Sequence, residues 1–171
     1  MANRTTGITA RQTTTPLGPF TVLVDGDVVH ASGFTTSVEQ LAQLAALDMN
    51  AIAVSEDDHS ALAAVRKYFD GELAALDGVE TMERPGTAPF RTAARAALRK
   101  IPPGTANTYT ELAASAGNPR AVRAAGSACA TNPTALFVPC HRVVRSDGKL
   151  GGFLYGIDVK QALLDHEAKH A

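Results

Sequence analysis

Two short apolar runs near the N-terminus predict a β-hairpin. Residues 20–24 (FTVLV) and 28–31 (VVHA) are rich in β-branched side chains, and Asp25-Gly26 stands between them. An Asp-Gly pair flanked by such runs is a strong hairpin signal, because the tight turn needs residues that accept a positive φ. We therefore expect a small sheet in the first part of the chain.

Helical spacing follows this hairpin. Ser37, with Gln40 three residues later, is typical of a capping box, and a second helix is predicted across residues 60–70, ending at Gly71. No cluster of catalytic residue types appears in this part of the chain, which indicates a scaffold. The apolar positions of the first helix fall on one face: Val38, Leu41, Leu44, Ala45 and Met49.

A polar segment with glycine and proline, residues 78–87, divides the chain. Up to Pro85 there are five basic and twelve acidic residues, a net charge of −7, whereas eleven basic and five acidic residues from Gly86 onward give +6. The basic half favours contact with a polyanion, although two oppositely charged halves that attract each other explain the split equally well. We predict an α/β (α+β) fold. Its N-terminal scaffold domain, residues 1–80, holds a β-hairpin or small sheet plus helices, and its C-terminal domain, residues 87–171, is mostly helical.

Three helices are predicted between residues 88 and 131. Residues 88–100 place apolar side chains on one face and arginines on another, and residues 108–116 and 120–131 flank a tight break at 117–119. Two short helices around a glycine-containing turn match a helix-turn-helix, although any helical hairpin gives the same pattern. The inward side chains of the first helix are Phe90, Ala94, Ala97 and Leu98, and its arginines are Arg91, Arg95 and Arg99.

The last of these helices carries small side chains, among them Ala124 and Ser127, so its backbone can approach a partner closely. Arg120 and Arg123 project from it. Small residues with isolated arginines suit a helix pressed against DNA, where an arginine is long enough to enter a groove or a base stack. A small-residue helix packed on another helix, with surface arginines, is the alternative.

The composition is that of an ordinary globular protein, with 45% hydrophobic and 19% charged residues. The N-terminus is polar and does not resemble a signal peptide, and no apolar run approaches the roughly 18 residues that span a membrane. We therefore expect a cytoplasmic protein with no membrane partner. The two cysteines, Cys129 and Cys140, exclude a four-cysteine zinc site and argue against a disulfide framework, which leaves two reduced thiols as the simpler interpretation.

Cys140 lies between an apolar segment, residues 135–138 (ALFV), and a basic turn. We expect the apolar segment to be a short buried strand. A cysteine there is often only a small core residue. However, His141 is adjacent and Arg142 and Arg145 follow closely, and positive groups near a thiol stabilise the nucleophilic thiolate. The pattern therefore predicts a reactive cysteine with a lowered pKa.

A predicted helix at residues 158–170 supplies a third group, and Asp158 with Gln161 marks its start as another capping box. A carboxylate on the same face as leucines is costly to bury unless it has a partner, and His141 is the obvious candidate. Cysteine, histidine and glutamate then act as nucleophile, base and orienting acid. Because side chains alternate along a strand, the adjacent Cys140 and His141 cannot face each other directly, and a turn at the cysteine or a bridging water is needed to connect them. The face in question carries Lys160, Leu163, Leu164 and Glu167.

The segment VPCHRVV, with NP upstream, resembles the active-site signature of the O6-alkylguanine-DNA alkyltransferases, the methylated-DNA–protein-cysteine methyltransferases. The resemblance runs from about Thr87 to Glu167, through YTELA, GNPRAVRAAG and GKLGGF, and more weakly into the N-terminal half through PLGPFTVLVDG and YFDGEL. It implies a single, irreversible transfer of an alkyl (methyl) group to Cys140. The donor is O6-alkylguanine, or O4-alkylthymine, in double-stranded DNA, and the target base is flipped out first. It also implies a monomer that needs no cofactor and no metal.

The resemblance further implies roles for individual residues. Cys140 accepts the alkyl group, His141 deprotonates it through a water, and Glu167 holds the histidine. Tyr109 presses on the phosphate beside the target nucleotide and donates toward the guanine ring, and Asn132 is the hinge between the recognition helix and the active-site segment. DNA contacts are implied at Arg120, Arg123, Ala124 and Ser127, with Arg123 filling the space left by the flipped base, and a guanine pocket at Val143, Phe153, Leu154 and Tyr155.

The sequence departs from the family pattern at several positions. The usual FQ..VW is FRTAAR here, with Arg91 and Arg95 in place of Gln and Trp, and the usual PYG has Pro103 at its centre. These departures lie before the helix-turn-helix and bear on core packing. Leu154 and Tyr155 stand where small residues are usual. A bulky residue there also occurs in the adaptive-response branch of the family, which implies a variant pocket.

Two readings from other classes stay open. The first is a DNA binder or damage sensor without catalysis, which has no need of an intact Cys140, His141 and Glu167. The second is a cysteine hydrolase, which needs an oxyanion hole and product release. Turnover of a thioester substrate distinguishes the hydrolase.

Overall fold

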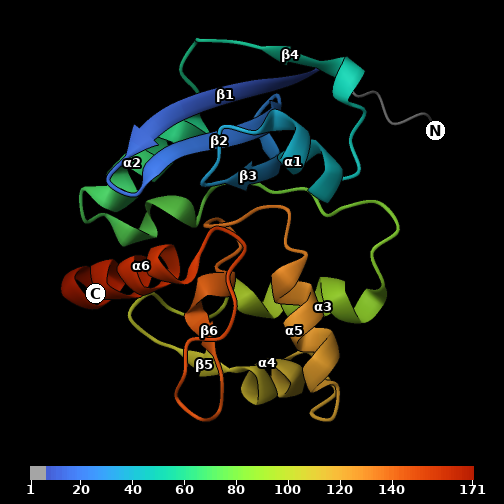
Figure 1. Ribbon diagram of the computed structural model, residues 1–171, viewed down its shortest axis with the longest axis vertical. Coiled ribbons are helices and arrows are strands. Elements are labelled where there is room, and N and C mark those ends of the chain that lie inside the picture. The colour runs from blue at the N-terminus through green and yellow to red at the C-terminus, as the bar shows by residue number, and fades with distance from the viewer. Residues whose placement is uncertain (1–6) are drawn as a thin grey trace.

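The computed structural model of the protein describes residues 7–171, so residues 1–6 of the predicted N-terminal domain lie outside the described residues. A four-stranded sheet forms the upper part of the molecule (Figure 1), with the strand order β3-β2-β1-β4. β1 pairs antiparallel with β2, β2 antiparallel with β3, and β1 parallel with β4. The strands are β1 (Ile8–Thr15), β2 (Gly18–Asp25), β3 (Val28–Gly33) and β4 (Ile52–Val54).

The predicted hairpin is confirmed, because β2 and β3 meet at Asp25-Gly26 and Gly26 has a φ of 57°. Strand β1 was not predicted. Its sequence, ITARQTTT, is mostly polar, and only Ile8, Ala10 and Thr15 are buried. Pairing with the apolar β2 makes this segment a strand, and that partner is invisible in a local window of sequence.

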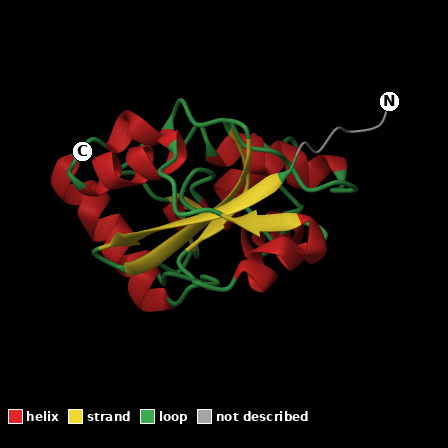
Figure 2. Ribbon diagram, turned by 90° about the horizontal axis from the view of Figure 1, so that it is seen from above, coloured by secondary structure: helices red, strands yellow, loops and turns green. Residues whose placement is uncertain are grey.

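Helices cover both faces of the sheet (Figure 2). Because side chains alternate along a strand, Val22 and Val24 of β2 face the cluster that includes α2, whereas Leu23 faces the cluster that includes α1. Ser37 caps α1 by accepting from the Gln40 amide, while the Gln40 side chain accepts from the Thr35 hydroxyl, so the predicted reciprocal capping box does not form. The helical elements of this part are α1 (Val38–Leu44), η1 (Met49–Ala51), α2 (Ser60–Phe69) and η2 (Leu73–Leu76).

The lower part of the molecule is mainly helical, and α6 lies between it and the sheet (Figure 1). A second core joins α3, α4 and α5 to the segment around Cys140. α4 carries a full capping box between Thr108 and Glu111. The elements are α3 (Pro89–Leu98), β5 (Asn107–Thr108), α4 (Tyr109–Ser115), α5 (Val122–Ala130), η3 (Cys140–Arg142), β6 (Val143–Val144) and α6 (Ile157–His170).

Two local expectations were wrong. Residues 135–138 are not a strand, because Leu136 has a φ of 75° and the backbone turns there. The Asp158–Gln161 capping box does not form either. α6 already begins at Ile157 after Gly156, and Gln161 instead donates to Asp165.

Arg95 was expected on a face other than the inward apolar one, together with Arg91 and Arg99, but it is only 5% exposed. Its guanidinium forms an ion pair with Glu83 and donates to the Ala128 carbonyl (3.1 Å) and to the Thr131 hydroxyl (2.8 Å). The last carbonyls of a helix have no partner within the helix, and a cation is favoured there. Arg95 therefore ties the linker to the C-terminal end of α5, at the position where the family pattern has a tryptophan.

Candidate active site

Cys140 begins the 3₁₀ turn η3, directly after Pro139, and is 6% exposed. Its side chain faces a cavity of about 280 Å³, which Tyr109, Asn132 and Tyr155 also line. The turn changes the direction of the backbone between Cys140 and His141, as adjacent residues with a shared function require. The nucleophile candidate therefore sits at the base of a compartment the size of a small molecule.

His141 and Glu167 are both 0% exposed and form a hydrogen bond of 2.7 Å between Nε2 and Oε1. Since an ionised carboxylate only accepts, the imidazole donates from Nε2, and Nδ1 carries the lone pair. Nδ1 is buried and has no hydrogen-bond partner within the described residues. Burial lowers the pKa of His141, and the bond to Glu167 only partly opposes this effect. His141 is therefore a neutral base with one free acceptor.

Glu167 accepts from three side chains: His141, Arg142 and Tyr68. Burial by itself raises the pKa of Glu167, but the hydrogen bonds from His141 and Arg142 outweigh burial and lower it to about 2. The carboxylate is therefore ionised at any physiological pH. Sequence reasoning missed two of these partners, Arg142 and Tyr68, and Tyr68 lies 99 positions away along the chain.

The surroundings of Cys140 disfavour the expected thiolate. Burial raises the pKa of Cys140, and the hydrogen bond from Asn132 and the charge of Lys160 oppose it only in part. Arg142 points to Glu167 and to the Ile101 carbonyl (2.7 Å), and Arg145 pairs with Asp147 (2.9 Å). The two arginines that follow Cys140 in the sequence thus form their contacts with other groups, and the prediction that the pKa of Cys140 is lowered was wrong.

Asn132 and Tyr109 also line the cavity. The Asn132 amide donates to the Val138 carbonyl (2.9 Å), and its Oδ1 accepts from the Thr134 amide (3.1 Å), so it fixes the chain between α5 and Cys140. Tyr109 is the first residue of α4, and burial raises its pKa to about 12. Its hydroxyl is therefore a permanent donor at neutral pH.

The family model for the DNA-binding domain of 6-O-methylguanine DNA methyltransferase matches residues 89–169. A methylated-DNA–protein-cysteine methyltransferase of Salmonella typhimurium is 37% identical over 158 residues, which cover 90% of this chain and 91% of the relative. The O6-methylguanine methyltransferase of Mycobacterium tuberculosis has a TM-score of 0.81 and 32% identity, over 96% of this chain and 94% of that one. The same enzyme solved in complex with DNA has the same TM-score and identity. The chain belongs to the methylated-DNA–protein-cysteine methyltransferase family.

Lys160 is a buried feature of this methyltransferase that sequence reasoning placed on a face but gave no role. Its ammonium is 2.6 Å from the Val143 carbonyl, 2.6 Å from the Leu150 carbonyl and 3.3 Å from the Gly152 carbonyl. The lysine therefore fixes the loop that forms one wall of the cavity. Its sequence signal was its place on the same helical face as Leu163, where a lysine needs buried acceptors.

The predicted pocket residues divide into two groups. Phe153, Leu154 and Tyr155 line the cavity. The role expected of Val143 is one of its backbone, and its side chain is 0% exposed and packs in the helical core. Tyr155 does not swing into solvent. Its ring packs against Phe34, the residue that follows β3, with ring centroids 6.1 Å apart, and forms part of the cavity wall. Leu154, at 48% exposure, lies nearer the mouth.

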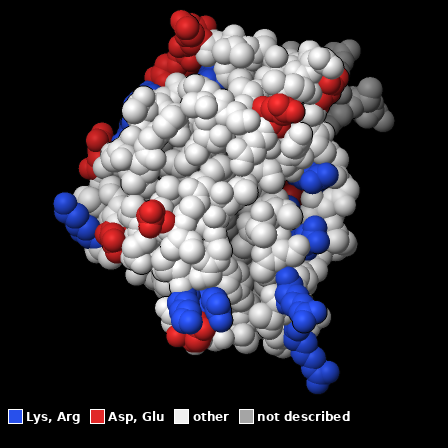
Figure 3. All heavy atoms as spheres, in the orientation of Figure 1, with Lys and Arg blue, Asp and Glu red and all other residues white. Residues whose placement is uncertain are grey.

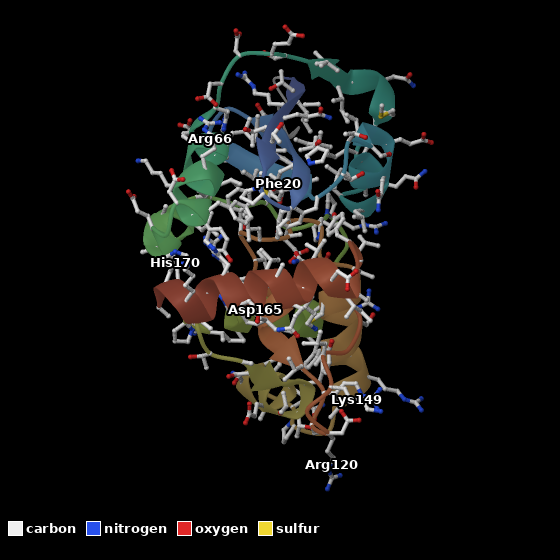
Figure 4. The ribbon with its side chains drawn as sticks, turned by 60° about the vertical axis from the view of Figure 1, so that its left-hand side comes forward. Phe20, Arg66, Arg120, Lys149, Asp165 and His170 are labelled. Carbon is white, nitrogen blue, oxygen red and sulfur yellow. The ribbon has the colours of Figure 1, made fainter. Side chains whose placement is uncertain are left out.

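The predicted DNA-contact residues lie on the outer side of α5 and the turn before it. Arg120 and Arg123 are exposed, and Ala124 and Ser127 are half-buried. Arg120 projects from the end of the molecule farthest from the sheet (Figure 4). Basic side chains also protrude at the lower end of the face shown in Figure 3. Within residues 7–171, no helix is long and apolar enough to cross a membrane, and no group of three or more His, Cys, Asp or Glu side chains is arranged to hold a metal.

Proposed function

We propose that this methyltransferase repairs DNA by moving the alkyl group of O6-alkylguanine, or of O4-alkylthymine, onto the sulfur of Cys140. The observation that carries the proposal is the buried series Cys140, His141 and Glu167, which opens into a cavity of about 280 Å³. A pure DNA binder needs no such series. A thioether on sulfur has no good leaving group, so each chain reacts once.

The free lone pair on His141 Nδ1 suggests the route of the proton. A water at Nδ1 takes the thiol proton of Cys140 and passes it to the imidazole, whose Nε2–H already donates to Glu167. The thiolate attacks the alkyl carbon, the carbon–oxygen bond breaks, and its electron pair enters the guanine ring. The ring takes up one proton from Tyr109, which regains a proton from solvent while His141 releases the thiol proton to solvent, so that overall the alkyl group moves to sulfur and one proton replaces it on the base.

The raised pKa of Cys140 fits this scheme. A thiol that stays protonated at rest is a poor nucleophile toward the many electrophiles in a cell. Deprotonation then occurs only when a base fills the cavity and the proton has a path to His141. The reactivity belongs to the complex with the damaged base and not to the free protein.

A base inside a stacked duplex cannot reach Cys140, so the target nucleotide has to be flipped into the cavity. We propose that α4 and α5 act as a helix-turn-helix, with the small residues Ala124 and Ser127 against the DNA. Arg123 fills the vacated space, and Arg120 contacts a phosphate. Asn132 joins this helix to the active-site turn, so binding and chemistry are connected within a few residues.

We also propose a division into a scaffold domain, residues 1–80, and a DNA-binding and transfer domain, residues 87–171. One apolar cluster is built only from the first range and another only from the second, which supports the division, and a third cluster with residues of both ranges packs the two domains together. We infer that the protein acts as a monomer on double-stranded DNA in the cytoplasm. Two free cysteines and a single-chain site that needs no partner residue support this.

Intact mass spectrometry tests the proposal. After the protein is mixed with a duplex that carries one O6-methylguanine, we expect one added methyl per chain, mapped to Cys140. Cys129 lines the same cavity and serves as the internal reference, since Cys129→Ala should still gain the methyl group and Cys140→Ala should not. Several turnovers per chain, or a methyl group on Cys129, would refute the assignment.

A further inference from the structure

Tyr68 connects the sheet-bearing half of the molecule to the candidate proton path. It lies at the C-terminal end of α2, is 0% exposed, and its hydroxyl is 2.8 Å from Glu167 Oε1 on α6. The lower end of α2 meets the C-terminal end of α6, where His170 lies (Figure 4). Burial raises the pKa of Tyr68 far above its usual range, so the hydroxyl always donates and the carboxylate always accepts.

The donors are unevenly shared between the two oxygens of Glu167. Oε1 accepts from the Tyr68 hydroxyl, from His141 Nε2 (2.7 Å) and from Arg142 Nη2 (2.8 Å), whereas Oε2 accepts from Arg142 Nε (3.0 Å). Of these three side chains, Tyr68 is the one that never carries a positive charge. It therefore holds Oε1 in place without adding charge near the imidazole.

This difference matters when His141 takes a proton. Arg142 and Lys160 are cations whose charge disfavours an imidazolium at His141, and Glu167 favours it. A cationic side chain in the place of Tyr68 would add to the charges of Arg142 and Lys160 and would disfavour proton uptake by His141 further. A neutral hydroxyl satisfies a lone pair of the carboxylate and leaves the balance close to that set by the charged groups.

We propose that Tyr68 is a positioning residue for the alkyl transfer, which holds the Glu167 carboxylate against His141 and so makes the packing of α2 part of the proton path. The inference rests on the proposed function, because it assumes that His141 is the base for Cys140.

The position of Tyr68 is itself determined by several contacts. Its carbonyl accepts a hydrogen bond from His166 Nε2 (2.7 Å), and its ring packs against Phe69 with centroids 5.1 Å apart. His170, one turn beyond His166, lies against the end of α2 (Figure 4), where a side chain at Gly71 would come within 2.8 Å of it. α2 and α6 are thus joined by two hydrogen bonds, one that reaches the active site and one that does not.

Tyr68 and His170 provide a matched pair of variants. Tyr68→Phe removes the bond to Glu167 and keeps the ring, whereas His170→Ala removes a side chain of α6 that lies against the end of α2 and is not bonded to Tyr68 or Glu167. Single-turnover methyl transfer is measured from pH 5 to 9 with saturating O6-methylguanine duplex, together with the melting temperature. A carboxylate with one fewer donor attracts an imidazolium more strongly, so the pKa of His141 rises in Tyr68→Phe.

We expect the acidic limb of the pH–rate profile to move to higher pH in Tyr68→Phe, so that the rate below its midpoint falls by about threefold to tenfold. His170→Ala should lower the melting temperature at most slightly and leave the acidic limb at the pH of the wild type. A Tyr68→Phe profile that is unshifted or shifted to lower pH overturns the inference, as does an equal shift in both variants. If the wild type transfers no methyl to Cys140, it is the proposed function that fails.

Discussion

Replacing Glu167 with glutamine removes the charge that His141 and Arg142 share. The structure gives a magnitude for the loss of stability. The change in the pKa of Glu167 from 4.5 to about 2 corresponds to about 3 kcal/mol. Since Arg142 is 6% exposed and keeps its charge, a cost of about 3–5 kcal/mol is expected for breaking the buried pair.

The pH dependence follows from the direction of the shift. A carboxyl group with a lowered pKa stabilises the folded state above its unfolded pKa, and this contribution is lost as the pH falls through the folded pKa. The difference in unfolding free energy between wild type and Glu167→Gln should therefore be constant from about pH 5 to 8 and should shrink as the pH falls from about 4.5 toward 2.

The transfer rate should fall as well, because a glutamine cannot stabilise the imidazolium that forms when His141 takes the thiol proton. We expect a loss of about 100-fold or more in single-turnover methyl transfer, in the range by which a positioned base contributes. Affinity for undamaged duplex should be unchanged, since Glu167 is 0% exposed.

Urea unfolding and quenched-flow transfer assays measure the two effects. Asp165→Asn is the matched control, because this carboxylate lies on the exposed side of the same helix (Figure 4), where its contact is with Gln161. The reasoning is wrong if Glu167→Gln unfolds at the wild-type urea concentration, or if it transfers methyl groups within threefold of the wild-type rate.

Three further predictions concern the DNA, the pocket and the core. Arg120→Ala should weaken binding to every duplex and reduce the salt slope by about one, as for a lost phosphate contact, whereas Arg123→Ala should slow repair of duplex far more than reaction with the free base; equal slowing on both would remove the role of Arg123. Tyr155 forms part of the cavity wall, so the wild type should react poorly with O6-benzylguanine and Tyr155→Gly should gain about tenfold or more, while methyl transfer stays within about twofold; a wild type that takes both bases equally contradicts this. Arg95→Met should lower the unfolding free energy by about 3 kcal/mol, because Glu83 and the end of α5 lose their partner, and an unchanged urea midpoint would show that these contacts contribute little.

Local sequence was sufficient where neighbouring residues decide the structure. The hairpin at Asp25-Gly26 and the short helices α4 and α5 follow from turn residues, caps and apolar spacing within a few positions. The motif around Cys140 likewise indicated a reactive thiol and the family, because its proline, cysteine and histidine are contiguous. The pairing of His141 with Glu167 was also accessible, since a carboxylate on an apolar helical face requires a buried partner.

Tertiary structure alone decided the rest. Residues 135–138 turn instead of forming a strand because the chain there meets β3, where Ser32 donates to the Pro133 and Ala135 carbonyls. Arg95 is buried because the end of α5 and Glu83 of the linker meet beside it. Such contacts join positions far apart in the chain, so no local window contains them.

The electrostatics of the site show the same division. The sequence determined that Cys140 is followed by a histidine and two arginines, which suggested a thiolate, but the fold sends Arg142 to Glu167 and Arg145 to Asp147. Burial then raises the pKa of the thiol, and Tyr68 reaches the carboxylate from 99 positions away. The local sequence determines which chemical groups the active site contains. Their charge states depend on burial and on distant partners, and only the packed chain determines those.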